Sequence, residues 1–405
     1  MAAHNRTADT FSSNRIYAHI VGWGMAVPDR VLSNHDLAAI VETSDEWIVT
    51  RTGIHERRIA GETESTATLG LKAAQRALEV AEILPIELDM VIVATSTPEY
   101  IFPSTASLIQ DWLGAVKAGA FDLSAACSGF VYGVNFAAQA IRSGSIETAL
   151  VIGSETMSRV LDWQDRGTCI LFGDGAGAVV LKASDVEGGI LSSVLRSDGS
   201  GWDLLTIPTV GSQDADVLGA DSAQHKMGKM YMNGGEVFKF ATRVIGESIQ
   251  QALAQAGLTI ADVNLIIPHQ ANARIIQSAA RALKVEQDLF MSNLERYGNT
   301  SAASIPIALC EAVELGRVKQ GDHLVFVGFG GGLSWGAMVV RWGRPESAER
   351  RTLYRQRQQF SYFLAHWRRR LVRLSRRFNE TVGRIRPEQG RIRRLRRKID
   401  RQPLD

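Results

Sequence analysis

The chain has 405 residues, of which 45% are hydrophobic and 22% are charged, an ordinary composition for a globular protein. Its polar N-terminal stretch lacks the order of a signal peptide, and no apolar run approaches the ~18 residues of a bilayer span. We therefore expect neither secretion nor membrane crossing. Three scattered cysteines argue against a disulfide framework or a zinc site and favour a reducing, cytoplasmic setting.

The formal net charge of +2 is an average over two unlike parts of the chain. Residues 344–405 carry 20 basic and 6 acidic side chains, a net charge of +14. Residues 1–343 carry the remaining 25 basic and 37 acidic side chains, a net charge of −12. This asymmetry predicts an appended basic segment with an anionic partner.

Apolar runs bounded by turn residues alternate with longer stretches of helical period, a pattern typical of α/β proteins. Strands are predicted at Tyr17–Val21, Met90–Ala94, Ala149–Ile152, Ala176–Leu181, Leu265–Ile267, Leu324–Val327 and Ala337–Val340. Helices are predicted at Ser65–Ala81, Thr105–Leu113, Gly129–Ser143, Gly234–Ala256 and Asn272–Leu283.

Three short segments recur later in the chain at nearly one offset, which predicts a duplicated fold. The segment from Asp89 resembles the one from Asp262, Leu150–Gly153 resembles Val325–Gly328, and Ser124–Cys127 resembles Ser301–Ser304. The last pair places a cysteine in one half and Ser304 in the other. The predicted organisation is a flexible N-terminus (1–15), two halves (16–185 and 186–343) and a basic tail (344–405).

Cys127 is the first candidate for chemistry. It follows a run of small residues and directly precedes a helical pattern, so a helix N-terminus is expected to stabilise its thiolate. The alternative is a buried structural thiol, and the local sequence does not separate the two interpretations.

His269 follows a strand-like run, at the sheet edge where α/β proteins bind ligands. The alternative is a hydrogen-bonded histidine of the core. Asn299 lies between a glycine and a Ser/Ala run, where a turn or cap residue is the alternative. The glycine-rich segment Gly328–Gly332 can present backbone N–H groups to an oxyanion, and it lacks the spacing of phosphate and dinucleotide loops.

Seven motifs in order, from about Tyr17 to Trp342, resemble the β-ketoacyl-acyl carrier protein synthase III family. The resemblance implies a thiolase-like five-layer α/β fold of two duplicated halves, in a homodimer. It implies a decarboxylative Claisen condensation of an acyl-CoA with malonyl-acyl carrier protein, which initiates fatty acid synthesis without a metal or redox cofactor. The motifs are Thr43–Ile54, Asp122–Phe130, Asp165–Thr168, Phe172–Ala178, Pro268–Ile275, Gly298–Ser304 and Gly328–Ala337.

The resemblance also implies residue roles. Cys127 is the acyl-accepting nucleophile, and His269 and Asn299 bind the malonyl thioester carbonyl. The backbone N–H groups of Cys127 and Gly331 form the oxyanion hole. The remaining implied sites are coenzyme A contacts at Thr43, Trp47, Arg51, Arg166 and Asn272, carrier-protein contacts at Arg274 and Lys239, and acyl-pocket residues at Phe102, Met157 and Phe172.

The Cys-His-Asn set separates this chain from related condensing enzymes that use two histidines, a second cysteine or a glutamate base. Two alternatives stay open: a synthase III-like acyltransferase of a polyketide or other specialised pathway, and a non-catalytic scaffold.

The basic tail has an amphipathic helical pattern. We consider three roles for the tail. It could be a helix packed on the body, a peripheral helix that binds an anionic membrane through residues 352–401, or a docking surface for an acidic carrier protein; the membrane role is favoured. No nucleic acid is expected, because no reader motif accompanies the arginines. The apolar positions are Phe360, Phe363, Leu364, Trp367, Leu371, Leu374 and Phe378, and the basic ones are Arg368, Arg369, Arg370, Arg373, Arg376 and Arg377.

Overall fold

The computed structural model of this chain describes residues 15–209, 226–343 and 354–385. The flexible N-terminus predicted for 1–15 lies outside these ranges except for Arg15, as does the tail beyond Ile385. Each of the strands and helices predicted from the sequence is confirmed. Most of the strands are longer than predicted, and the helices match within one residue.

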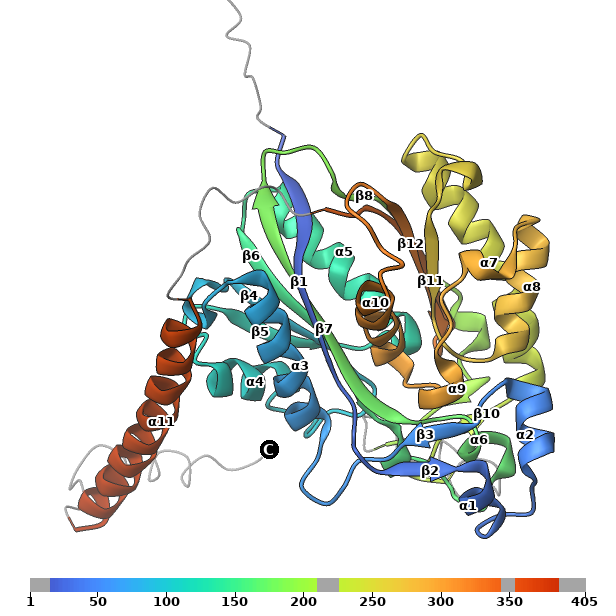
Figure 1. The fold of residues 1–405 in the computed structure, drawn as a ribbon. Helices are drawn as coiled ribbons and strands as arrows, with labels where there is room; N and C mark the ends of the chain where they lie inside the picture. The colour runs from blue at the N-terminus through green and yellow to red at the C-terminus, as the bar shows by residue number, and fades with distance from the viewer. Residues whose placement is uncertain (1–14, 210–225, 344–353, 386–405) are drawn as a thin grey trace, which may run out of the picture.

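Two mixed β-sheets form the centre of the molecule (Figure 1). The first has the order β1-β7-β6-β4-β5, and the second has the order β8-β13-β12-β11. The first sheet comprises β1 (Tyr17–Ala26), β7 (Asp174–Ser184), β6 (Thr148–Thr156), β4 (Met90–Ala94) and β5 (Gly119–Leu123). The second comprises β8 (Gly189–Ser197), β13 (Ser334–Arg341), β12 (His323–Gly330) and β11 (Leu265–Pro268).

The two sheets repeat one another in strand direction as well as in order. In each, the first three strands are antiparallel and the next pair is parallel. The parallel β4–β5 pair has a counterpart in the isolated parallel bridge between Ile266 and Phe290. The duplication predicted from short sequence matches is therefore visible in the topology.

The structure corrects the alignment of the two halves around the cysteine. Strand β6 begins at Thr148 and β12 at His323, 175 positions later. The short 3-10 helices η2 (Ala126–Ser128) and η7 (Ser301–Ala303) keep this offset, and both begin with a residue of positive φ. Cys127 is thus equivalent to Ala302, and the predicted pairing of Cys127 with Ser304 is wrong by two residues.

Six helices complete five layers (Figure 1). Apolar clusters fill the three interfaces: the outer face of each sheet, and the space between the sheets. Helices α3 (Thr66–Ala81) and α4 (Thr105–Leu113) cover the first sheet, α5 (Gly129–Arg142) and α10 (Ser304–Glu314) lie between the sheets, and α7 (Gly234–Gln255) and α8 (Ala273–Leu283) cover the second. The predicted thiolase-like five-layer fold is confirmed.

Short elements at one end of the layers surround the ends of several strands (Figure 1). Their caps are encoded locally: the Ser44 side chain accepts a hydrogen bond from Trp47 N at the start of α2, and Gly53 ends α2 in the left-handed conformation. These elements are β2 (Val31–Ser33), α1 (Asn34–Ala38), α2 (Asp45–Thr52), β3 (Glu56–Arg58), α6 (Arg166–Cys169), β9 (Leu205–Thr206), β10 (Tyr231–Met232) and α9 (Leu294–Tyr297).

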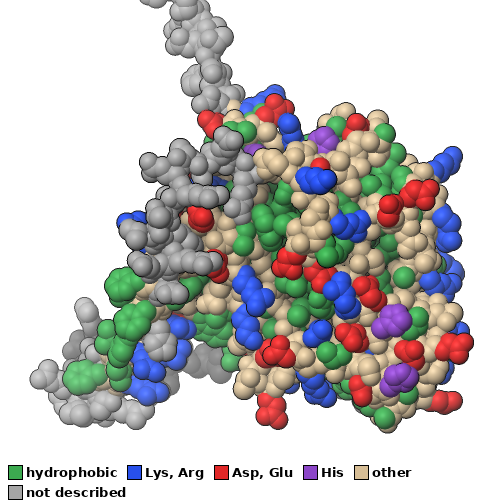
Figure 2. Space-filling model, viewed as in Figure 1, with side chains coloured by type: hydrophobic (Ala, Val, Ile, Leu, Met, Phe, Trp, Pro, Cys, Tyr) green, Lys and Arg blue, Asp and Glu red, His purple; other side chains and the backbone are tan. Residues whose placement is uncertain are grey.

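The tail forms one further helix, α11 (Tyr354–Ile385), which packs against α4. The contact face includes Gln358, Tyr362 and Ala365, and Gly114 at the end of α4 faces Ala365 closely. Hydrophobic side chains follow one side of α11 and basic side chains the other (Figure 2). Over the described residues, no helix combines the length and apolar character needed to cross a bilayer.

Candidate active site

Cys127 lies in η2, between the end of β5 and the start of α5. The side chain is buried, with 6% of the residue exposed. Its Sγ donates a hydrogen bond to the Ser301 Oγ at 3.4 Å. A Cβ on Gly330 would lie 2.7 Å from the Cys127 backbone nitrogen, so only glycine allows the β12 end to approach the cysteine this closely.

His269 directly follows β11 and is 2% exposed. Its Nδ1 lies 2.7 Å from the Ser304 Oγ, and the Gln270 N–H donates to the same oxygen at 3.4 Å. Because burial lowers the pKa of His269 to about 3, the imidazole is neutral at physiological pH. The contact between Nδ1 and Ser304 is compatible with either tautomer of the neutral ring; we assign the Ser304 hydroxyl as the donor, which places the ring proton on Nε2.

Asn299 is held by its main chain beside the segment that precedes β7. Its N–H donates to the Leu171 carbonyl at 2.8 Å, and its own carbonyl accepts from Gly173 N at 3.0 Å. The side-chain Oδ1 accepts from Ser301 N at 2.8 Å. Among the described residues no acceptor is bonded to its Nδ2, so the amide can donate to a ligand in the cavity that it lines.

Two cavities meet at the cysteine. The entrance cavity, of about 440 Å³, is lined by Cys127, His269 and Asn299 together. The inner cavity, of about 380 Å³, is lined by Cys127 and by Gly331 of the glycine-rich loop. The three predicted catalytic residues thus share one cavity, and the thiol stands at its junction with a second.

Comparison with known proteins places this arrangement in a family. The family models described as 3-oxoacyl-[acyl-carrier-protein] synthase III and as the C-terminal part of that enzyme match residues 121–199 and 253–342. The β-ketoacyl-[acyl-carrier-protein] synthase III of Desulfitobacterium hafniense is 54% identical over 325 residues, covering 80% of this chain and 98% of the relative. The enzyme of the same name from Symbiobacterium thermophilum is 52% identical with the same coverage.

The chain belongs to the β-ketoacyl-acyl carrier protein synthase III family. Solved structures agree. The synthase III of Aquifex aeolicus has a TM-score of 0.75 at 46% identity, covering 80% of this chain and 100% of that one. The priming β-ketosynthase of the R1128 polyketide pathway has a TM-score of 0.75 at 38% identity, covering 82% and 98%. This synthase III chain is therefore a condensing acyltransferase.

The coenzyme A contacts implied by the resemblance fall at and around the entrance cavity. Arg51 and Asn272 line it, and the Asn272 side chain also caps α8 and donates to the Arg51 carbonyl. The Arg51 and Arg166 guanidinium carbons lie 4.6 and 4.8 Å from the centre of the Trp47 ring. Thr43 carries a buried hydroxyl that has no hydrogen-bond partner within the described part of the chain.

Arg274 and Lys239, the predicted carrier-protein contacts, also line the entrance cavity. The Arg274 guanidinium lies over the Phe238 ring at 5.5 Å, and Lys239 pairs with Glu236 at 2.8 Å on the exposed side of α7. Both positive groups therefore stand at the mouth of the cavity that leads to Cys127.

Of the three predicted acyl-pocket residues, two line the inner cavity. Met157 and Phe172 are buried and form part of its wall, together with Met230. Phe102 is 85% exposed and lines neither cavity of its own chain. Its predicted role across a dimer stays a prediction.

The thiol of this synthase is not the stabilised thiolate that its place before a helix predicts. Burial raises the pKa of Cys127 to about 12, and Glu155 adds to the increase, while the hydrogen bond to Ser301 opposes it. The expectation of a lowered thiol pKa is therefore wrong, because desolvation is the largest cause acting on this thiol.

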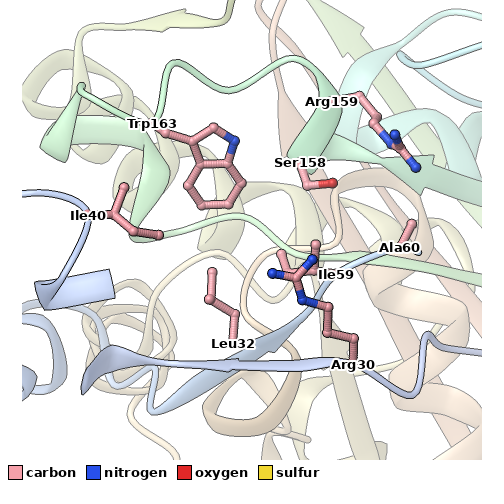
Figure 3. Close-up of a pocket in the computed structure, with 8 residues that line it drawn as sticks. All are labelled: Arg30, Leu32, Ile40, Ile59, Ala60, Ser158, Arg159 and Trp163. Atoms are coloured by element: carbon pink, nitrogen blue, oxygen red, sulfur yellow. The ribbon is translucent and has the colours of Figure 1, made fainter. Parts of the chain in front are cut away.

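Sequence reasoning missed three polar residues at this site. Ser301 and Ser304 lie in the Gly298–Ser304 motif, and their contacts to Cys127 and His269 require the fold. The only sequence signal for Glu155 was that an acidic residue follows the apolar run of strand β6. Another cavity, of about 380 Å³, contains no predicted site residue (Figure 3); it lies between Arg30, Arg159 and Trp163.

Proposed function

We propose that this synthase condenses an acyl-CoA starter with malonyl-acyl carrier protein through an acyl-Cys127 intermediate, giving 3-oxoacyl-acyl carrier protein at the start of fatty acid synthesis. The observation that carries the proposal is the position of Cys127 at the junction of two cavities, one of which also holds His269 and Asn299. The inner cavity suits the acyl chain, and the entrance cavity suits the two thioester carriers.

In the first half-reaction the thiolate of Cys127 attacks the acyl-CoA carbonyl. The tetrahedral oxyanion needs two donors, and we assign them to the backbone N–H groups of Cys127 and Gly331. The close approach of Gly330 to the Cys127 backbone nitrogen supports this assignment, because it brings the loop and the cysteine N–H together. Collapse of the intermediate releases coenzyme A as its thiolate, which takes a proton from water.

In the second half-reaction the malonyl thioester occupies the entrance cavity. Loss of CO₂ leaves its electron pair on an enolate, whose oxygen accepts hydrogen bonds from the His269 Nε2–H and the Asn299 amide. The enolate carbon attacks the acyl-Cys127 carbonyl, and the cysteine thiolate leaves. Decarboxylation drives this step, so it needs neither a metal nor a redox cofactor.

The test follows a radiolabelled acyl group. Wild-type protein incubated with labelled acyl-CoA should retain about one label per chain, Cys127→Ala should retain none, and the matched control Cys310→Ala should label like wild type. Cys310 is also buried but lies on α10, outside both cavities. A wild type that stays unlabelled by acyl chains from two to about twelve carbons would contradict the proposal and favour a scaffold.

The positive groups at the cavity mouth support the proposed carriers. Trp47, flanked by two guanidinium groups, offers a flat surface for the adenine, and Arg274 and Lys239 offer charge to an acidic carrier protein. Arg274→Glu should raise the KM for malonyl-acyl carrier protein and leave acylation by acyl-CoA unchanged. Equal effects on both half-reactions would contradict a carrier-specific contact.

We further propose a homodimer in which Phe102 reaches the partner's acyl pocket. Tyr100, Ile101 and Phe102 form an exposed apolar run, and the edge strand β5 exposes Phe121. Analytical ultracentrifugation should give twice the chain mass, and Phe102→Ala should lengthen the acyl-CoA preferred in steady-state assays. An unchanged chain-length preference in a confirmed dimer would remove Phe102 from the pocket.

For the tail we propose peripheral binding to an anionic membrane on the cytoplasmic side. The helix contacts the body through Gln358 and Ala365, while the apolar stripe from Phe360 to Phe378 points the other way and is exposed. A helix that served only to pack on the body would turn this stripe inwards. Exposed Trp367 and Phe residues beside arginines suit the headgroup region of an anionic bilayer.

Liposome flotation tests the tail. The intact chain should float with vesicles containing anionic lipid and much less with neutral vesicles, whereas a chain ending at Gly343 should float with neither. A double variant, Phe363→Ser and Trp367→Ser, should lose binding while keeping all arginines. Equal flotation of the intact and shortened chains would contradict the proposal.

A polyketide role is the second candidate, favoured by the likeness to the R1128 priming ketosynthase. The two roles differ in the carrier protein that supplies malonate. Rates with fatty-acid and polyketide carrier proteins, measured side by side for each acyl-CoA, decide between them.

A further inference from the structure

Glu155 is a buried carboxyl group for which the two half-reactions above have no use. It lies near the end of β6 and is 0% exposed. No ion pair within the described part of the chain includes it. Instead, it accepts hydrogen bonds from Thr97 Oγ1 at 2.6 Å, Ser96 N at 3.0 Å, Ser301 Oγ at 3.0 Å and Thr95 Oγ1 at 3.2 Å. Burial raises the pKa of Glu155 and the four donors oppose that increase, so the carboxylate is a stronger base than an exposed one and is still solvated by the protein when it is ionised.

Ser301 joins this carboxylate to the reactive thiol. Its Oγ donates to Glu155 Oε1 at 3.0 Å and accepts from Cys127 Sγ at 3.4 Å. The Ser301 hydroxyl is the hydrogen-bond partner that the structure gives to the thiol, and no bond between the thiol and His269 exists among the described residues. The thiol, the hydroxyl and the carboxylate are thus linked by two successive hydrogen bonds, and in each of them the donor is on the Cys127 side and the acceptor on the Glu155 side.

The fold fixes the position of Ser301 between Cys127 and Glu155. Ser301 opens η7 with a φ of 50°, an uncommon backbone conformation for a residue other than glycine. Strand β6 contacts η7 at Gly153, where a Cβ would lie 2.2 Å from the Ala302 carbonyl oxygen. Only glycine at this position lets η7 approach closely enough for Ser301 to reach both Cys127 and Glu155.

We propose that Glu155 receives the proton of the Cys127 thiol through Ser301 during acylation and returns it when condensation ends. As the Cys127 sulfur attacks the acyl-CoA carbonyl, the thiol proton passes to Ser301 Oγ while the Ser301 proton passes to Glu155. The products are acyl-Cys127, protonated Glu155 and the coenzyme A thiolate. When the enolate displaces the cysteine, the reverse transfer restores the thiol and the carboxylate.

Charge explains why the relay suits this site. The transfer moves one buried negative charge from Glu155 to Cys127 and creates no second one, whereas a thiolate beside an ionised Glu155 would place two like charges in a dry site. It also leaves Glu155 neutral while the enolate forms. His269 cannot replace it as a base at neutral pH, because burial holds the pKa of the imidazole at about 3.

A merely structural role is the competing explanation, since Glu155 also ties residues 95–97 to η7. Asp174 provides the matched control. It is another fully buried carboxyl that accepts from Ala60 N and from Ser158, and it has no bond to Cys127. Asp174→Asn should therefore cost stability as Glu155→Gln does, without altering the reactivity of the thiol.

The experiment measures coenzyme A release in a single turnover with acyl-CoA from pH 6 to pH 9. Glu155→Gln and Ser301→Ala should each slow acylation by about 10²-fold at pH 7, the usual size of a proton-transfer contribution, and their rates should rise with pH more steeply than wild type. Glu155→Asp should recover part of the rate. Wild-type rates and pH profiles in Glu155→Gln, or an equal change in Asp174→Asn, would overturn the proposal.

Infrared difference spectroscopy provides a direct readout. Acylation of the wild type should produce the band of a protonated carboxyl that shifts in D₂O, and Glu155→Gln should lack it. An acylated wild type without this band would refute the relay. The inference rests on acylation of Cys127, so alkylation of the thiol by iodoacetamide over the same pH series separates a failure of the relay from a failure of the proposed function. A protein that takes no acyl group but whose alkylation still depends on Glu155 would contradict the proposed function alone.

Discussion

The buried neutral His269 predicts a specific pH dependence of stability. Its pKa is about 3 in the folded protein against 6.5 for an ordinary histidine. Below pH 6.5 the unfolded chain therefore binds a proton that the folded protein rejects, and stability is lost as the pH falls. The contribution is fully present above pH 6.5. Between pH 7 and pH 5 the loss is about 2 kcal/mol, and by pH 3 it reaches about 4 kcal/mol.

The assay compares the wild type with His269→Gln in urea denaturation at pH 5, 6 and 7 and at one protein concentration. The wild type should lose about 2 kcal/mol more than the variant between pH 7 and pH 5. The NMR signals of the His269 ring should stay those of the Nε2–H tautomer over the same range. Parallel stability curves, or a ring that titrates near pH 6.5, would refute the assignment of a neutral histidine and with it the proposed donor to the enolate.

Three further substitutions have defined outcomes. Ser304→Ala removes the donor to which we assign the His269 tautomer. Decarboxylation of malonyl-acyl carrier protein should therefore slow by about tenfold, equivalent to one hydrogen bond, while acylation by acyl-CoA is unchanged. Equal slowing of decarboxylation and acylation would contradict this role of Ser304. Trp47→Ala should raise the KM for acyl-CoA by about tenfold with little effect on kcat. Gly153→Ala should destabilise the fold by about 3 kcal/mol through overpacking, whereas Gly199→Ala, which has open space around its Cβ, should be nearly neutral in thermal unfolding.

The sequence was sufficient for most of the fold for two reasons. The central strands are buried on both faces and are continuous apolar runs, and most of the helices are buried on one face and therefore periodic. It did not predict α10, which lies between the two sheets and is buried along almost its whole length, so that no polar face marks its period. It also missed β5, an edge strand of five residues that carries little apolar patterning. The predicted pairing of Cys127 with Ser304 rested on two Ser-Ala-Ala runs outside the strands, and three small residues are too few to fix the register of a repeat.

At the site, the sequence indicated the residues to which we assign the reaction and missed the polar residues that contact them. Cys127, His269 and Asn299 share one cavity as the resemblance implies. The hydrogen bonds of Cys127 and His269 are made to residues far away in the chain, Ser301 and Ser304. Burial raises the pKa of the thiol, and no local sequence pattern reports how deeply a side chain is buried.

These protonation states together explain how one site can perform two opposite steps. Acylation needs a nucleophilic sulfur, whereas condensation needs the site to accept a new anion on the malonyl thioester. A neutral His269 donates to that anion without having to lose a proton first. If Glu155 holds the thiol proton while the acyl group is on Cys127, the enolate is the single buried negative charge when it forms. The same exchange of one charge between sulfur and carboxylate would then prepare the site for each half-reaction in turn.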